Sequence, residues 1–329
     1  MPIFPSVACR LATALLLSLA SSFATAQDWP TKPVRLVVPV GQGGVMDTVI
    51  NATRPAVEER LGQKLVVEYR AGAGGNVGMQ SVLAAGADGY TFAVAPANTI
   101  TINQYLYAGM TFDPLRDFIP VTMLVDVPLV LSVSAKHPVN TMREFIEHAR
   151  ANAGKVNYGS PGAGTPPHLA VELFARSAGL RLQHVPYKGG NAAAVALVTN
   201  EVQMMLIAYA SLRGQILGGL VRPLAVAAPE RITGLPNVPT MAEAGYPDVL
   251  KALPRSWWGL AAPKGTPETI VNRVAAEFRA ALAAPQAQAQ FREAGLVPVG
   301  STPADFGKLW TADAARWSAL IRDANLKLE

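Results

Sequence analysis

The stretch Val34-Arg35-Leu36-Val37-Val38-Pro39-Val40-Gly41-Gln42-Gly43-Gly44 decides the fold, because it joins an apolar run to a glycine loop and then to an amphipathic helix. Residues 34–40 are mostly β-branched, which predicts a buried strand. The glycines permit a tight turn, and from Asp47 onward apolar residues recur at helical spacing. Such a unit directs the free N–H groups of a helix N-terminus at one point, a geometry that suits an anion.

The other half of the chain contains a second unit of the same kind. Residues 156–158 predict a strand, residues 159–165 form its glycine loop, and Pro166 and Pro167 stand at the first helical positions, where a missing N–H costs nothing. One glycine turn is ordinary in α/β proteins, and both loops could simply turn the chain. Because there are two, we predict that they face each other and hold one ligand between them.

The composition is that of a globular protein, since 50% of the 329 residues are hydrophobic and 16% are charged. The formal net charge of +5 is spread without a basic run, which slightly favours anionic ligands and gives no case for nucleic acid. The one cysteine, Cys9, lies near the N-terminus. The rest of the chain therefore has no disulfide, no thiolate metal site and no cysteine nucleophile.

Residues 1–26 predict a signal peptide. Arg10 supplies a positive segment, Leu11 to Leu19 an apolar one, and Ala24-Thr25-Ala26 a small-x-small cleavage site. The apolar stretch is too short to span a bilayer. We therefore expect a soluble, exported, periplasmic protein.

Strands and helices alternate along the remainder of the chain, which predicts an α/β fold with largely parallel sheets flanked by helices. The long extended run 119–133 predicts a crossover strand into a second lobe, and 222–227 predicts the return crossover. We predict that lobe 1 comprises residues 27–125 and 229–329 and that lobe 2 comprises residues 126–228. Thr141 and Glu144 predict a capping box, Ser211 is expected to cap a short helix, and two helices should finish the chain.

Several polar side chains near the loops are candidate ligand contacts, each with a structural alternative. Asp47 either caps its helix or orients a water toward the ligand. His168 is a donor or a packed histidine, and its spacing to Glu172 resembles a metal pair without a third ligand. Lys188 supplies positive charge or is an exposed turn lysine. Asn98 and Thr99 line the floor of the site or cap a loop.

The chain resembles the periplasmic substrate-binding proteins of the tripartite tricarboxylate transporters, the Bug family, from Trp29 almost to the C-terminus. An ordered set of motifs carries the resemblance: Lys32-Pro33, Val38-Pro39, Gly43-Gly44, Asp47, Arg70, Gly72-Ala73-Gly74-Gly75-Asn76, Gly78, Asp88-Gly89-Tyr90-Thr91, Asn157-Tyr158-Gly159-Ser160, Gly162, Gly164-Thr165, His168-Leu169, His184-Val185-Pro186-Tyr187-Lys188-Gly189, Val238-Pro239-Thr240, Glu243 and Trp257 to Gly259. The resemblance implies a type II periplasmic-binding-protein-like fold, with two α/β lobes joined by two crossovers. It also implies an organic anion, usually a carboxylate, held between the lobes.

Three positions depart from the pattern of this family. Val40 stands where an aromatic residue is usual, Ala71 where proline is usual, and Ile207 where many members carry aspartate. In members that bind amino acids, that acid could receive the ligand ammonium group. Its replacement argues against an amino acid and favours a plain carboxylate or an acid with an apolar body.

Two hypotheses follow. The first is a monomeric binding protein, without metal or cofactor, that delivers an organic carboxylate to membrane transporter subunits or to a sensor. The second is an exported hydrolase or lyase that uses Ser160 and His168. The dinucleotide, phosphate-loop and metalloprotease patterns are incomplete or absent. The predicted ligand-binding residues are Val40, Gly41, Gly43, Gly44, Asp47, Asn98, Thr99, Ser160, Gly162, Gly164, Thr165, His168, Lys188 and Ile207.

Overall fold

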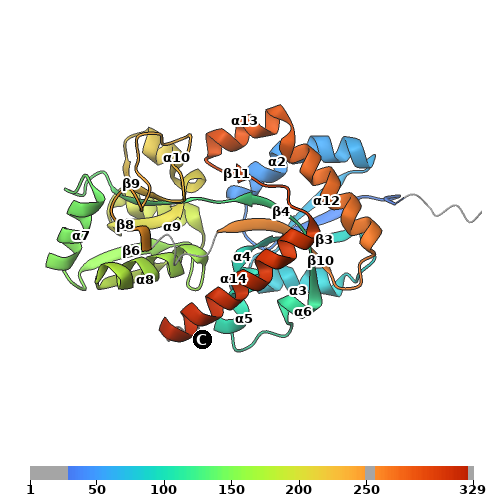
Figure 1. Cartoon of the computed structure of the whole chain (residues 1–329), viewed down its shortest axis with the longest axis horizontal. Coiled ribbons are helices and arrows are strands. Elements are labelled where there is room, and N and C mark those ends of the chain that lie inside the picture. Colours follow the sequence, from blue (N-terminus) through green and yellow to red (C-terminus); the bar gives the residue numbers. More distant parts are fainter. Residues whose placement is uncertain (1–28, 249–255, 325–329) are drawn as a thin grey trace, which may run out of the picture.

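The chain folds into two α/β lobes, each built on its own mixed sheet (Figure 1). The computed structural model describes residues 29–248 and 256–324, so the predicted signal peptide lies outside the described residues. The first sheet has the order β11 (Val297–Pro298), β4 (Phe118–Asp126), β10 (Trp257–Pro263), β3 (Thr91–Pro96), β1 (Val34–Val38), β2 (Leu65–Tyr69). The second has the order β7 (Leu182–Pro186), β6 (Val156–Ser160), β8 (Met204–Ala208), β5 (Leu129–Ser134), β9 (Val221–Ala227).

Helices flank both sheets, which confirms the predicted two-lobed α/β class. The first lobe carries α2 (Val45–Leu61), the 3-10 turn η1 (Ala73–Gly75), α3 (Asn76–Ala84), α4 (Ala97–Thr101), α5 (Asn103–Leu106), α6 (Pro114–Asp117), α12 (Glu268–Ala283), α13 (Pro285–Ala294) and α14 (Pro303–Ala324). The second carries α7 (Met142–Ala151), α8 (Pro166–Ala178), α9 (Gly190–Thr199) and α10 (Tyr209–Leu217). None of the helices in the described residues is both long and apolar enough to cross a membrane.

Two local predictions need correction. Helix α13 was not expected, so three helices, not two, follow β10. Ser211 does not cap α10, because that helix begins at Tyr209 directly after β8. The predicted capping at the start of α7 is confirmed: Thr141 accepts a hydrogen bond from the Glu144 N–H (3.2 Å), and the Glu144 carboxylate reaches back to the backbone N–H groups before the helix, including that of Asn140 (2.7 Å).

The strand directions make the carboxyl edges of the two sheets face each other. In the first sheet β1 and β3 are parallel, and β10 is antiparallel to both β3 and β4, so β4 runs with β3. Only Val127 and Pro128 separate β4 from β5, which therefore starts at the first lobe and runs away from it. Strand β8 is antiparallel to β5 and parallel to β6, so both return toward the first lobe. The loops after β1 and β6 consequently lie where the two lobes meet.

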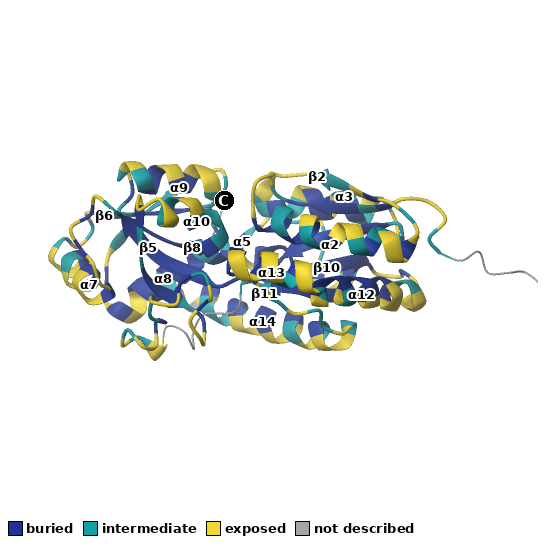
Figure 2. Cartoon of the chain, turned by 90° about the horizontal axis from the view of Figure 1, so that it is seen from above, coloured by how far each residue is buried: buried dark blue, intermediate teal, exposed yellow. Residues whose placement is uncertain are grey.

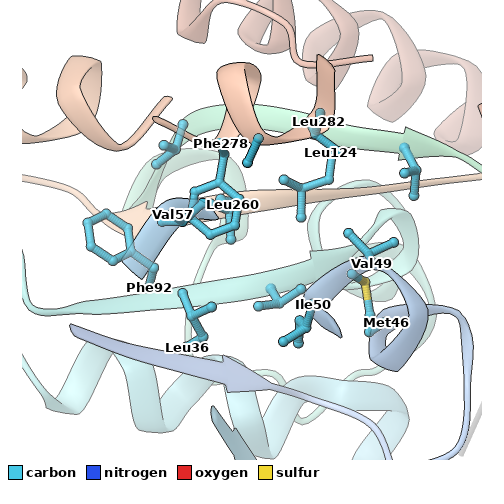
Figure 3. Close-up of a cluster of buried hydrophobic side chains, with 14 of the residues drawn as sticks. Leu36, Met46, Val49, Ile50, Val57, Phe92, Leu124, Leu260, Phe278 and Leu282 are labelled. Carbon is cyan, nitrogen blue, oxygen red and sulfur yellow. The ribbon is translucent and has the colours of Figure 1, made fainter. Parts of the chain in front are cut away.

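Apolar packing fixes the helix that follows the first glycine loop. Val49, Ile50 and Val57 of α2 are almost fully buried and pack between the first sheet and α12, where they meet Leu260 and Phe278 (Figure 3). These positions repeat every three to four residues, so one face of the helix is apolar. The start of α2 is thereby held at a fixed place on the carboxyl edge of the sheet.

Residues that follow β9 also pack against the second sheet. Val226 forms a parallel bridge with Thr240, and Met241 is fully buried in the core cluster of the second sheet. The boundaries of the two lobes stay a prediction, and residues 240–246 pack with the second lobe in this structure.

A buried apolar cluster joins the lobes on one side. Leu169 of α8 packs against Ile102 and Leu106 of the first lobe and against Trp317 and Ile321 of α14. All five side chains are at most 5% exposed. Figure 2 shows α8 and α14 on this side of the molecule and α9 on the other.

We predict that Gly259→Ala lowers the free energy of unfolding by about 1–3 kcal/mol, as expected for overpacking. A Cβ atom on Gly259 would lie 2.2 Å from the ring of Phe306 and 2.8 Å from the backbone oxygen of Thr122. Gly214→Ala in α10 is the control, since nothing lies within 4 Å of its added Cβ and alanine favours a helix. Chemical denaturation should show a loss for the first variant and none for the second; equal stabilities would contradict the prediction.

Candidate ligand-binding site

The first glycine loop is held by Asp47. One oxygen of the Asp47 carboxylate accepts hydrogen bonds from the N–H groups of Gly43 (2.7 Å) and Gly44 (3.0 Å), and the other accepts from the Tyr69 hydroxyl. Burial and the hydrogen bond to Asp47 raise the pKa of Tyr69 to about 12, so the phenol stays a donor. Asp47 thus caps α2 from its third helical position.

The hydrogen bonds to Asp47 change which donors the first lobe can offer. We predicted from the sequence that Gly43 and Gly44 bind the ligand carboxylate, but their N–H groups already donate to the carboxylate of Asp47. The first N–H groups of a helix have no partner within the helix. Within the described residues, those of Val45 and Met46 make no hydrogen bond and are the donors that remain at the start of α2.

The second glycine loop is held by two hydroxyl groups. Ser160 is fully buried, and its oxygen accepts from the Gly162 N–H (3.2 Å) and lies 3.0 Å from the Gly162 carbonyl oxygen. The Thr165 hydroxyl donates to the same carbonyl oxygen at 2.7 Å. Both hydroxyls therefore shape the loop from within, and φ of +152° at Gly162 is a conformation that favours glycine.

Two histidines lie behind this loop. The Nδ1 atom of His168 accepts a hydrogen bond from the Gly164 N–H at 3.0 Å, and the Nε2 atom of His184 lies 2.7 Å from the Ser160 oxygen. The two imidazole rings stack with centroids 4.0 Å apart, and the Tyr158 ring stacks on His184 at 4.9 Å. Burial lowers the pKa of each histidine to about 4, so both rings are neutral at pH 7.

The structure adds a third helix N-terminus to the two that the sequence predicted. The N–H of Gly189, which precedes α9, donates to the carbonyl oxygen of Pro161 in the second loop (3.0 Å). The side-chain amide of Asn191, in the first turn of α9, donates to the carbonyl oxygen of Gly43 across the lobes (3.3 Å). The starts of α2 and α9 and the loop before α8 are thus linked in one place. Helices α2 and α9 present backbone N–H groups there, whereas the first two residues of α8, Pro166 and Pro167, have none.

Apolar and exposed residues complete this region. Val40 packs in the same cluster as Ala208 and Ala210 of the second lobe. Ile207 is buried behind the start of α9, where a Cβ on Gly190 would lie 3.3 Å from its terminal carbon. Gly41 and Lys188 are exposed, and Lys188 lies in the same turn as Gly189.

Asn98 and Thr99 support another loop of the first lobe. The Asn98 side-chain amide donates to the carbonyl oxygen of Gly74 (2.8 Å) and to the side chain of Asn103 (3.2 Å). Thr99 is fully buried and donates to the carbonyl oxygen of Pro96. In this structure both side chains hold backbone, and a direct role in ligand contact stays a prediction.

Sequence reasoning missed two residues of the site. His184 is in the quoted His184-to-Gly189 motif, but its position opposite Tyr158 follows from the pairing of β6 with β7. Asn191 follows Gly189 and Gly190, and this third glycine turn before a helix was the signal that could have identified it. A separate cavity of about 410 Å³ lies between α8 and α14 and is lined by residues that include Leu169, Glu172 and Trp317.

Two lobes whose helix N-termini converge define a two-lobed solute-binding protein of the periplasmic type. A family model described as the tripartite tricarboxylate transporter family receptor matches residues 49–326. The chain belongs to this family. The family and its structural neighbours are binding proteins and not enzymes, so the hydrolase hypothesis is wrong. The structure also places His184, and not His168, against the Ser160 hydroxyl.

Relatives and solved structures of similar length agree with this assignment. The chain is 34% identical to a UPF0065 protein from a Pseudomonas species, over 96% of this chain and 94% of that one. It is 31% identical to BugT of Bordetella pertussis, over 93% of each chain. A Rhodopseudomonas palustris protein solved with adipate has a TM-score of 0.86 at 33% identity, covering 92% of this chain and all of that one. MatC of Rhodopseudomonas palustris with bound malate has a TM-score of 0.81 at 29% identity, covering 89% of this chain and all of that one.

We predict that Asp47→Ala lowers the free energy of unfolding by about 1 kcal/mol, the usual effect of losing a helix cap. The change leaves the N–H groups of Gly43 and Gly44 and the Tyr69 hydroxyl without their acceptor. Asp47→Asn is the matched control, because its one side-chain oxygen keeps part of this bonding, and its loss should be smaller. Urea denaturation of the three proteins tests the order, and an Asp47→Ala protein as stable as the parent would contradict it.

Proposed function

We propose that this chain is exported to the periplasm, where as a monomer it captures a small organic carboxylate between its lobes and delivers it to the membrane subunits of a tripartite tricarboxylate-type transporter. One observation carries the proposal: the hydrogen bond from Asn191 to Gly43 brings the start of α9 in one lobe to the glycine loop of the other. Helix N-termini from both lobes then surround one space, and their dipoles favour a negative charge there.

A carboxylate suits these donors because the N–H groups are uncharged and already fixed by the fold. Each hydrogen bond to a charged acceptor contributes about 1.5–3 kcal/mol net. A few together exceed the ~8 kcal/mol that a micromolar site requires. The adipate and malate in two structures of the same family support this choice of ligand class.

The apolar side of the site supports a ligand without an ammonium group. Ile207 is buried among aliphatic side chains, and Val40, Ala208 and Ala210 form an apolar contact between the lobes. An ammonium group next to these residues would lose water without gaining an acceptor, which is costly. We therefore infer a plain carboxylate, including one with an apolar body, over an amino acid.

Closure of the lobes provides the signal that the transporter subunits read. The polar contacts between the lobes near the start of α9 are weak. The Arg213–Glu293 ion pair, with an N–O distance of 3.9 Å, is exposed, and so is the Asn191 side chain. A ligand that contacts both lobes adds differential affinity for the closed state. Ligand and closure are thereby coupled.

A thermal-shift screen with mono-, di- and tricarboxylates tests the proposal. A ligand that binds only the folded protein raises the unfolding free energy by RT ln(1 + [L]/Kd), about 2.7 kcal/mol at a hundredfold excess over Kd. Native mass spectrometry should show the bound acid unchanged. Stabilisation by amino acids and not by plain carboxylates would contradict the inferred ligand class.

We predict that Gly43→Ala weakens carboxylate binding at least about tenfold, the effect of losing roughly 1.4 kcal/mol of closure. Its Cβ would lie 2.9 Å from the Asn191 amide nitrogen, so the Asn191 side chain must move and its hydrogen bond to the Gly43 carbonyl oxygen is lost. Gly86→Ala is the matched control, because φ is +83° there against +89° at Gly43 and nothing lies within 4 Å of its Cβ. Both variants should lose similar stability, but only Gly43→Ala should lose affinity by calorimetry; equal affinities would contradict the prediction.

A further inference from the structure

The second glycine loop depends on a buried polar cluster that no contact with ligand explains. His168, Ser160 and Tyr158 are at most 8% exposed, and they lie between the second sheet and α8. Through His168 and Ser160 the cluster holds the backbone N–H groups of Gly164 and Gly162. Buried polar networks of this kind specify one geometry only when every member is satisfied.

His168 performs this role only without a proton on Nδ1. The hydrogen bond from the Gly164 N–H requires a lone pair on that atom (3.0 Å). In the neutral ring the proton is then on Nε2. A second proton would place an N–H donor opposite another N–H donor, and the bond that fixes Gly164 would be lost.

His184 is subject to the same restriction through its neighbour. Its ring stacks on that of His168 at 4.0 Å with an interplanar angle of 19°, so two imidazolium charges would repel each other at close range. Other groups near the pair are the Tyr158 and Ser160 hydroxyls of β6 and the Glu172 carboxylate of α8. The Glu172 carboxylate accepts a hydrogen bond from the Tyr158 hydroxyl. Glu172 favours a charged His184, and burial together with His168 opposes it.

We infer that His168 and His184 are positioning residues for the ligand site, which hold the 160–165 loop in its binding shape only while both rings are neutral. The inference rests on the proposed function for its ligand and on the hydrogen bonds above for its geometry. It assigns His168 a role behind the loop instead of the ligand contact that the sequence suggested. It also makes carboxylate affinity depend on the protonation of groups that the ligand does not touch.

The titration of these rings gives the pH range. The pKa of each is lowered by burial from 6.5 to about 4. Both rings are therefore neutral at pH 7, and protons enter them only near pH 4. Between pH 6.5 and 4 these two histidines bind protons in the unfolded chain but stay neutral in the folded chain. The free energy of unfolding therefore falls as the pH decreases.

Substitutions of His168 separate its hydrogen bond from its volume. His168→Asn keeps a side-chain oxygen where Nδ1 accepts, and His168→Leu fills space without accepting. With adipate and malate as probes at pH 7, His168→Leu should bind about tenfold more weakly, the loss expected for one hydrogen bond. His168→Asn should remain within about twofold of the parent. Equal affinity of the leucine variant would overturn the inference.

A pH profile gives a readout that a purely structural role would not change. The double variant His168→Asn/His184→Gln keeps the hydrogen-bonding groups but cannot titrate. Protonation of the carboxylate ligand weakens binding to both proteins equally, so the ratio of parent to double-variant affinity removes this effect. It should be near one at pH 7 and fall at least about twofold at pH 4, and further below. His148→Gln, on α7, is the control and should follow the parent. A constant ratio would overturn the inference.

Amide hydrogen exchange tests the loop without a ligand. At pH 7 the Gly164 amide should exchange faster in His168→Leu than in the parent, and His168→Asn should retain protection. If neither adipate nor malate binds the parent but exchange follows this order, the probe acids of the proposed function fail and the positioning role stands. If binding is observed and exchange does not change, the positioning role fails alone.

Discussion

The direction of the strands at the first crossover is the constraint on which the rest of the structure depends. Because only Val127 and Pro128 join β4 to β5, the second sheet must begin at the edge where the first sheet ends. Strands β6 and β8 then run back toward the first lobe, since β8 is antiparallel to β5. Helices that follow these strands start at the same edge. Convergence of α2, α8 and α9 is therefore a consequence of topology, and the side chains only adjust its details.

Those details place charge outside the space where the donors converge. The carboxylate of Asp47, next to the first loop, accepts hydrogen bonds from two backbone N–H groups and one hydroxyl. Ser160 and Thr165 direct their hydroxyls into their own loop. A site built from fixed backbone dipoles attracts an anion without the desolvation cost that a buried cation would add. The same arrangement makes the site sensitive to loop shape, because displaced backbone donors have no side-chain flexibility to compensate.

The features that sequence could predict are those set by neighbours along the chain. The units around 34–61 and 156–178 carry their periodicity, glycines and prolines locally, and the structure confirms both as strand, loop and helix. Asp47 capping α2 is also a local hydrogen bond. Helix α13 was missed because Phe291 is its one large apolar residue and gives no clear period.

The features that sequence could not predict depend on pairing between distant strands. His184 meets Ser160 because β6 and β7 pair with Tyr158 opposite His184, and no local pattern encodes that register. Asn191 meets Gly43 only after both lobes have folded and approached each other. The two roles that the sequence left open for His168 have the same cause, since its spacing from Ser160 is compatible with either side of the loop.

The two sides of the interface between the lobes differ in a way that favours movement at one of them. On the α8–α14 side, Leu169 and Trp317 are buried in an apolar cluster, and separating them would expose that surface to water. On the α9 side, the Asn191 and Arg213 contacts are exposed and polar, and water can replace them at little cost. The apolar contact on this side is made by the smaller side chains of Val40, Ala208 and Ala210. Separation therefore costs more at the apolar cluster than at the polar rim, so the rim with its glycine loops is where the lobes part most easily. Since the converging helix starts lie at that rim, the same asymmetry admits a ligand and lets the ligand determine closure.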